Sequence, residues 1–283
     1  MSPWLRPRAG RPYVAGAPML VAHRGGSGIA PENTLVAFQS ATETWWADML
    51  EMDARLTKDG HVVVIHDATV DRTTNGSGPV ASHTLAELKA LDAGYRFVDE
   101  SGRHSFRGRG VVVPTLEEVL MGCPDVWINV ECKAPEVAAP LATLVARMGA
   151  EHRVLVAAER ESSRLGARAH KGPWGASLEQ GFLLWLLHFL PGGSPYTPTA
   201  DILQLPEVWK GLRVVTPRFV RDAHRLNLPV QVWTVDRVED MRRLLEWGVD
   251  GIQTDRPDRL ARLLTDLVGR PVPPGARAAG VAA

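Results

Sequence analysis

Short apolar runs alternate with amphipathic segments along most of this 283-residue chain, and this alternation restricts the fold more than any other feature. Eight runs have the length of buried strands: residues 19–22, 49–55, 126–131, 154–157, 175–178, 202–205, 230–235 and 251–254. Helical patterns lie between most of them, at residues 34–46, 138–148, 161–170, 216–226 and 238–247. Strand–helix alternation builds βαβ units, so eight units predict an α/β fold, a (β/α)8 TIM barrel.

One segment departs from this alternation, because residues 53–66 (DARLTKDGHVVVIH) contain no helical pattern. The Asp59-Gly60 pair between apolar runs predicts a two-residue turn, in which case Asp53 faces His66. Side chains alternate along a strand, so we expect Glu51, Asp53 and His66 on one face. A turn this tight joins antiparallel strands only. The sequence therefore predicts a β-hairpin after the second strand, followed by a small insertion at about residues 68–115.

Length alone leaves one large domain or two ordinary domains open, and the eight strand–helix units favour one barrel. We expect an N-terminal extension over residues 1–17, the barrel over 18–268, and a disordered Pro/Ala/Gly-rich tail over 269–283. The chain has 32 Lys and Arg against 32 Asp and Glu, which argues against a nucleic-acid binder. With only two cysteines, Cys123 and Cys132, a disulfide scaffold is excluded.

The sequence predicts no transmembrane segment. Its longest apolar run, residues 182–190 (FLLWLLHFL), falls far short of the roughly 20 residues that cross a bilayer. The run is either a buried helix or a hydrophobic lip near a substrate mouth, where it would make transient, peripheral lipid contact. Residues 1–18 lack a secretory apolar region, so we expect a cytoplasmic protein. The sequence carries no indication of the oligomeric state.

His23-Arg24-Gly25-Gly26 ends the first predicted strand, where barrels place catalytic groups. The Arg24 guanidinium suits a phosphate or carboxylate, and the two glycines would let a ligand approach the backbone closely. Asn33 or Thr34 is the expected N-cap of the following helix, and Glu32 either faces the site or complements the helix N-terminus.

Charged residues in two other buried strands indicate a metal site. Glu51 and Asp53 share one face of the second strand, and Glu131 shares a face with Lys133 at the end of a later one. Three carboxylates favour a hard divalent cation such as Mg²⁺ or Ca²⁺. The alternative for Glu51 and Asp53 is an ion pair with Arg24 or Arg55. Cys132 points the other way and is expected in the core.

Two imidazoles, three carboxylates, one guanidinium and one ammonium together suit a phosphate ester as substrate. Cations would hold the charged oxygens, while imidazoles transfer protons near neutral pH. The partner we expect is therefore a small phosphodiester.

In their order along the chain, several short motifs resemble those of the glycerophosphodiester phosphodiesterases, a family similar in fold to the phosphatidylinositol-specific phospholipases C. They are HRGGSGIAPENT, EMD, TKDGHVVVIHD, RTTNGSG, TLAELKALDAG, PTLEEVL, NVECK, VQVWTVD and GVDGIQTDRPD, spread over about residues 19–262. The resemblance implies a (β/α)8 barrel that hydrolyses glycerophosphodiesters to glycerol 3-phosphate and an alcohol, within lipid and glycerol metabolism.

The resemblance also implies roles for individual residues. His23 and His66 match the catalytic acid and base, Glu51, Asp53 and Glu131 match the ligands of Ca²⁺ or Mg²⁺, and Arg24 and Lys133 match phosphate contacts. It implies attack of the glycerol 2-hydroxyl on phosphorus, giving a cyclic phosphate that water opens. Trp233, at the end of the seventh strand, would line the substrate pocket or pack in the barrel. Gln204, at the end of the sixth, would line the mouth or serve structure.

Three other functions remain open at this point. The apolar residues 182–190 would suit a lysophospholipase D-type reaction on single-chain lysophospholipids. A phosphodiesterase for inositol or glycosylated glycerol phosphates would need the same site chemistry. A catalytically inactive barrel that only binds phosphodiesters would be expected to lack one of the two histidines, and both are present.

Overall fold

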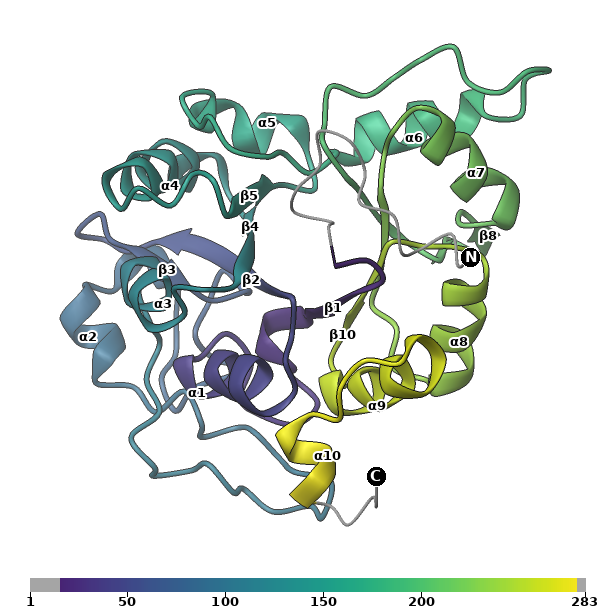
Figure 1. Ribbon diagram of the computed structural model, residues 1–283. Helices are drawn as coiled ribbons and strands as arrows, with labels where there is room; N and C mark the ends of the chain where they lie inside the picture. Colours follow the sequence, from purple (N-terminus) through teal and green to yellow (C-terminus); the bar gives the residue numbers. More distant parts are fainter. Residues whose placement is uncertain (1–15, 279–283) are drawn as a thin grey trace.

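The computed structural model describes residues 16–278, and their strands form a cylinder surrounded by helices (Figure 1). Residues 1–15 of the predicted N-terminal extension and residues 279–283 of the predicted tail lie outside the described residues. The strands are β1 (Met19–Ala22), β2 (Met49–Leu56), β3 (Val62–Val64), β4 (Trp127–Cys132), β5 (Val154–Ala157), β6 (Leu203–Pro206), β7 (Val208–Trp209), β8 (Leu212–Arg213), β9 (Val230–Trp233) and β10 (Gly251–Thr254).

The main sheet is parallel and runs in the order β5-β4-β2-β1-β10-β9-β6. Two isolated parallel bridges connect its ends, from Val156 to Trp174 and from Gly175 to Ile202. The predicted fifth strand at 175–178 is therefore wrong in extent, because only this bridged pair, Trp174 and Gly175, is strand-like. Ser177 caps a helix instead, and its side chain accepts a hydrogen bond from the backbone of Gln180. The predicted (β/α)8 architecture is confirmed.

The helices cover the outside of the sheet (Figure 1). They are α1 (Leu35–Gln39), α2 (Leu85–Lys89), α3 (Leu116–Gly122), α4 (Pro135–Arg147), α5 (Glu161–Arg164), α6 (Leu178–Leu187), α7 (Pro217–Arg225), α8 (Val238–Glu246), α9 (Pro257–Val268) and α10 (Pro274–Ala278). The expected helix at 161–170 is shorter, because α5 gives way to a 3₁₀ turn at Leu165–Ala167. Residues 274–278 of the expected disordered tail form α10, in which Ala276 is buried.

Alternation along the strands separates an outer core from the barrel interior. Leu20, Leu50 and Ile128 belong to the large apolar cluster shared with the helices, as does Cys132, which confirms its predicted place. Met19 and Met49 point the other way, into a smaller cluster inside the barrel. Further along the same inward faces, β2 and β4 carry their charged side chains. The inner apolar cluster therefore fills the barrel next to the site and supports these charged residues.

The predicted hairpin forms, with β3 antiparallel to β2, but its register differs by one residue. Its loop holds three residues, 58–60, rather than two. Gly60 has φ 83°, the left-handed conformation that closes a three-residue loop. The carbonyl of Asp53 accepts a hydrogen bond from the backbone of Ile65, so Asp53 faces Ile65 and not His66. His66 therefore follows the paired segment.

The insertion after β3 has an apolar core of its own. Val70, Val80, Leu88 and Val113 are buried together with residues of β3. An isolated antiparallel bridge between Val63 and Thr115 returns the chain to the barrel at the start of α3. The insertion is thus fixed to the edge of the site rather than extending as a free loop.

Residues 182–190 are only partly buried, so the interpretation as a buried helix is wrong for most of them. Leu184 is buried, whereas Phe182, Leu186 and Phe189 are exposed to 47%, 51% and 56%. None of the helices between residues 16 and 278 combines the length and apolar character needed to span a membrane.

Candidate active site

His23 and Arg24 follow β1 directly, in a 3₁₀ turn over His23–Gly25. Arg24 adopts φ 51°, and its backbone N–H donates to Oε2 of Glu51 at 2.9 Å. The Glu51 side chain on β2 therefore holds the turn that presents His23 and Arg24 to the pocket.

The two glycines after Arg24 serve helix packing in this structure. A Cβ on Gly25 would lie 2.7 Å from Cβ of Ala37 in α1, and one on Gly26 would lie 2.7 Å from Cγ of Pro257 in α9. Both also have positive φ, at 83° and 94°. The close approach that they allow is thus between the β1 turn and two helices.

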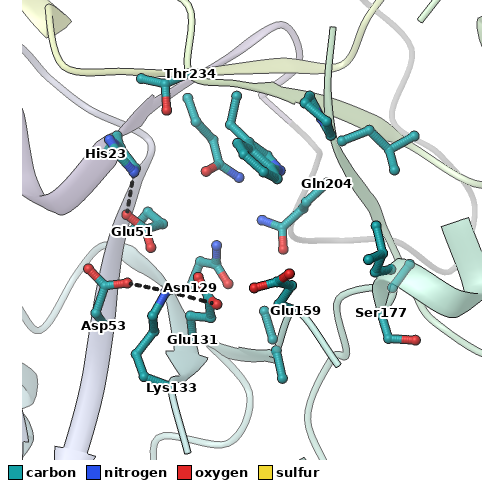
Figure 2. Close-up of a pocket in the computed structure, with 18 of the residues that line it drawn as sticks. His23, Glu51, Asp53, Asn129, Glu131, Lys133, Glu159, Ser177, Gln204 and Thr234 are labelled. Atoms are coloured by element: carbon teal, nitrogen blue, oxygen red, sulfur yellow. Dashed lines mark hydrogen bonds and ion pairs between the residues drawn. The ribbon is translucent and has the colours of Figure 1, made fainter. Parts of the chain in front are cut away.

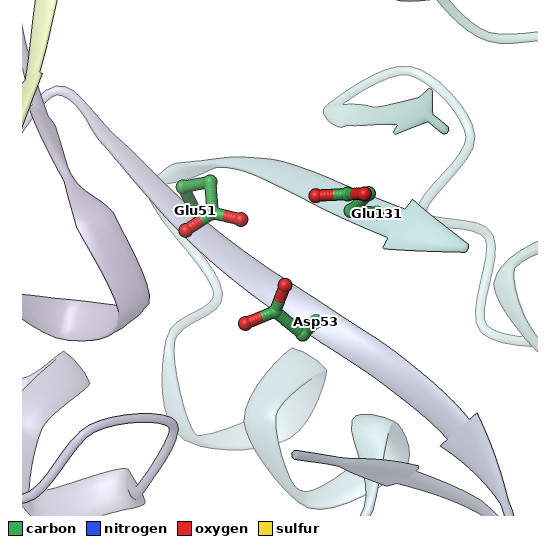
Figure 3. Close-up of side chains that lie close together, drawn as sticks. All are labelled: Glu51, Asp53 and Glu131. Atoms are coloured by element: carbon green, nitrogen blue, oxygen red, sulfur yellow. The ribbon is translucent and has the colours of Figure 1, made fainter. Parts of the chain in front are cut away.

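The three predicted metal ligands lie close together on the neighbouring strands β2 and β4 (Figure 3). Parallel register places Asp53 of β2 beside Glu131 of β4. Glu51, Asp53 and Glu131 each offer an oxygen, and these atoms lie within 4.8 Å of one another. Glu51 and Asp53 are buried and Glu131 is half-buried. An oxygen-only donor set of this kind suits Mg²⁺ or Ca²⁺.

Two further observations fit a cation at this cluster. Burial, followed by repulsion from Asp53, raises the pKa of Glu51 well above its usual range, so a positive charge nearby would favour its ionised form. Oδ1 of Asn129, buried beside the cluster, has no hydrogen-bond partner in the described part of the chain. An amide oxygen is an acceptable ligand for either metal.

Arg24 and Lys133 partly neutralise the carboxylates. Arg24 Nε lies 3.3 Å from Oδ2 of Asp53, and Lys133 Nζ lies 3.5 Å from Oδ1 of Asp53 and 3.1 Å from Oε1 of Glu131. Burial opposes the charge on Lys133, but Glu131 and Asp53 raise its pKa above the usual range. The alternative ion pair between Asp53 and Arg24 therefore exists, and it coexists with the three-carboxylate cluster.

Each histidine of the site is held through Nδ1 by a carboxylate. His23 Nδ1 lies 2.6 Å from Oδ1 of Asp255, and His66 Nδ1 lies 2.6 Å from Oδ1 of Asp67. Burial lowers the pKa of His23, but Glu51 and Asp255 outweigh it and raise that pKa above its usual value. With Nδ1 occupied in both rings, Nε2 is the nitrogen left for a substrate, and in His23 it lies 3.8 Å from Oε2 of Glu51.

Arg72 of the insertion connects the two sides of the site. Its guanidinium donates to both oxygens of Glu32, at 2.6 and 2.8 Å, and to both oxygens of Asp67, at 2.7 and 3.1 Å. Glu32 in turn accepts from Arg24 at 3.0 Å. Hydrogen bonds from Arg72, and then from His66, hold the pKa of Asp67 well below its usual value. One guanidinium thus orients the partners of both His66 and Arg24.

All the residues predicted for the site line a single pocket. Figure 2 labels several of them, among them His23, Glu131 and Lys133. Its empty space is about 1120 Å³, including the part open to solvent. Trp233 and Gln204 also line it, and Nε2 of Gln204 donates to Gln231 at 3.1 Å. The predicted residues on its walls are His23, Arg24, Glu51, Asp53, His66, Glu131, Lys133, Gln204 and Trp233.

Several residues of the site were not predicted. Thr34 caps α1 as expected, but Asn33 instead donates to Oδ2 of Asp53 at 2.8 Å and so orients a candidate ligand. Asp67 stands next to His66 in the sequence, which was an available signal. Asp255, far along the chain, lies at the end of the eighth barrel strand, where barrels gather catalytic groups.

A family model and individual related sequences both place this chain in the same family. Residues 23–159 and 191–259 match the model of the Glycerophosphoryl diester phosphodiesterase family. A relative named glycerophosphodiester phosphodiesterase from Caldanaerobacter subterraneus subsp. tengcongensis is 35% identical over 267 residues, covering 87% of this chain and 97% of its own.

Solved structures agree on the fold. The glycerophosphoryl diester phosphodiesterase domain of a Mycobacterium tuberculosis protein superposes with a TM-score of 0.78 at 22% identity, covering 87% of this chain and 98% of that one. An Oleispira antarctica phosphodiesterase, solved with the product sn-glycerol-3-phosphate, gives 0.71 at 23% identity, with coverage of 89% and 98%. On the family match and the sequence identity, this chain belongs to the glycerophosphodiester phosphodiesterase family and is an enzyme of that class.

Proposed function

We propose that this protein hydrolyses glycerophosphodiesters to glycerol 3-phosphate and an alcohol, using Ca²⁺ or Mg²⁺ and acid–base catalysis by His23 and His66. One observation carries the proposal: two histidines, each oriented by a carboxylate, share a pocket with three clustered carboxylates and two cations. The relative from Oleispira antarctica was solved with sn-glycerol-3-phosphate, which supports the same product here.

In the proposed reaction the glycerol 2-hydroxyl attacks phosphorus within the same molecule. Its oxygen bonds to phosphorus as the bond from phosphorus to the leaving alcohol breaks. One imidazole takes the hydroxyl proton and the other gives a proton to the alcohol. Water then opens the cyclic phosphate with the proton transfers reversed. Asp255 and Asp67 keep each ring in the tautomer and orientation that leave Nε2 free for these transfers.

Arg24 and Lys133 would hold the phosphate oxygens, since both cations line the pocket beside the carboxylates. Glu51, Asp53 and Glu131 would hold the divalent cation, with Asn129 within the same wall. When bound, the cation supplies positive charge against the phosphate oxygens. Trp233 and Gln204 would line the space for the glycerol or the leaving alcohol.

Replacing either histidine tests the assignment of acid and base. We expect His23→Ala and His66→Ala each to lower kcat for glycerophosphocholine by about 10²- to 10⁴-fold, because each removes a positioned proton donor or acceptor. Choline release measures turnover, and thermal unfolding monitors the fold. His104→Ala, at an exposed position outside the pocket, is the matched control. Near-normal turnover in a folded His23 or His66 variant would contradict the mechanism.

The contact between His23 and Asp255 is tested separately. Asp255→Asn keeps the shape but loses the charge that stabilises a protonated ring, so we expect kcat to fall about 10- to 100-fold with little change in KM. Asp258→Asn is the control, because this buried acid in the first turn of α9, three residues further on, pairs with Arg256. Equal losses in the two variants would indicate a role in loop structure instead.

Removing the metal tests the carboxylate cluster. We expect EDTA to abolish turnover and added Mg²⁺ or Ca²⁺ to restore it. Calorimetry should detect binding of one of these ions to the stripped protein, and Glu131→Gln should weaken that binding, since it removes one charged ligand. Full turnover after complete demetallation, or equal ion affinity in the variant, would contradict the proposed cation site.

A second candidate activity is a lysophospholipase D-type reaction on single-chain lysophospholipids. It is favoured by Phe182 of α6, a helix that begins at the mouth of the pocket and leaves this side chain exposed. This candidate predicts a higher kcat/KM for lysophosphatidylcholine than for glycerophosphocholine, measured by choline release for both. A preference for glycerophosphocholine would eliminate it as the main activity.

A further inference from the structure

An apolar groove lies between α6 and the short hairpin formed by β7 and β8. Every residue that lines it is apolar or glycine. Phe182 and Trp185 of α6 form one wall, and Trp209 and Leu212 of the hairpin form the other. No charged side chain lines the groove, and the indole nitrogens of Trp185 and Trp209 are the only hydrogen-bonding groups among its lining side chains. The groove therefore suits a hydrocarbon rather than a second polar head group.

The groove adjoins the catalytic pocket. Leu178, Leu205, Pro206 and Trp209 line both spaces. A molecule with its phosphodiester beside the carboxylate cluster could therefore extend a tail past these four residues without crossing a barrier of polar groups. This continuity distinguishes the groove from an isolated surface hollow.

Apolar exposure on the described surface is concentrated around this groove. Fourteen large apolar side chains are strongly exposed, and eight of these lie in residues 182–190 or 208–212. Phe182 is 47% exposed and Leu212 is 54% exposed, and both line the groove. Apolar exposure gathered on two neighbouring elements favours a binding surface.

Gly181 lets α6 pack closely on β6 beside the groove. It lies inside α6, where glycine is less favourable than alanine. A Cβ at this position would lie 2.9 Å from Cδ2 of Leu205, one of the residues shared with the catalytic pocket. A larger residue here would therefore push α6 or Leu205 out of place at the boundary of the two spaces.

We propose that this groove binds the single acyl chain of a 1-acyl lysophospholipid whose phosphodiester lies in the catalytic pocket. The proposal rests on the proposed hydrolytic function. The 2-hydroxyl of such a lipid is free, so its oxygen can bond to phosphorus while the bond from phosphorus to choline oxygen breaks and choline leaves with a proton. Water then opens the ring to give 1-acylglycerol 3-phosphate. A diacyl lipid lacks this hydroxyl and is not a substrate.

A chain-length series tests the groove. The substrates are glycerophosphocholine and the 1-acyl lysophosphatidylcholines from hexanoyl to dodecanoyl, all used below their micelle-forming concentrations. We expect kcat/KM for choline release to rise about fourfold for each methylene that the groove buries, until the chain outgrows it. Dioctanoyl phosphatidylcholine and a 2-deoxy decanoyl analogue should release no choline.

Substitutions in the walls of the groove test whether the gain in kcat/KM with acyl chain length comes from this groove. Phe182→Ser and Leu212→Ser, which alter opposite walls, should each lower the ratio of kcat/KM for the dodecanoyl lipid over glycerophosphocholine about 10-fold. Leu186→Ser is the matched control, because Leu186 lies on the same helix with 51% exposure but does not line the groove. It should leave the ratio unchanged.

The possible results distinguish a failure of the acyl-chain proposal from a failure of the proposed hydrolytic function. Turnover of glycerophosphocholine with no gain along the chain-length series overturns the acyl groove and leaves the hydrolytic function standing. Equal losses in Leu186→Ser and Phe182→Ser overturn it too, in favour of general adsorption to lipid. No turnover of any substrate with Mg²⁺ or Ca²⁺ overturns the hydrolytic function itself.

Discussion

The crowding of like charge at the upper end of the barrel is the constraint on which the rest of the site depends. Parallel register brings Asp53 beside Glu131, and Glu51 lies one inward position below Asp53. Three carboxylates whose oxygens lie within 4.8 Å of one another repel strongly away from water. Lys133, Arg24 and the amide of Asn33 compensate part of this charge. A divalent cation would compensate the remainder, and the anionic substrate would then meet a site with a net attraction for it.

The same charges connect catalytic parts that lie far apart in the sequence. Glu51 accepts a hydrogen bond from the backbone of Arg24, which fixes the turn that carries His23. On the other side, Arg72 of the insertion binds both Glu32 and Asp67, and Asp67 holds His66. The insertion thus does more than cover one edge of the barrel. Glu32, Asp67 and Arg72 each have two partners in this network, so the loss of one member would weaken several contacts at once.

The sequence alone predicts the elements whose side chains alternate cleanly between core and site. The bounds of β1 and β10 agree with the prediction, and β2 differs by one residue, because buried parallel strands form compact apolar runs. The hairpin register was wrong, because Asp59-Gly60 also occurs in three-residue loops and local sequence does not distinguish the two. The strand predicted at 175–178 was wrong, because the Ser177 cap starts a helix there. Asp255 and Arg72 were missed, since tertiary packing brings Asp255 to His23 and Arg72 to Asp67 and Glu32.

Chemistry and specificity occupy different parts of this fold. The inward faces of β2 and β4, with the turn after β1, carry the groups proposed for phosphodiester cleavage, and the sheet fixes them. The exposed apolar groups belong to α6 and the hairpin between β6 and α7, which follow the barrel strands as connections. Such connections tolerate change without disturbing the sheet. Gly181 lies at the junction, where one added carbon would meet Leu205 of β6. On the proposed function, cleavage of the phosphodiester would depend on the strand ends, whereas the size and polarity of the attached group would depend on these two connections.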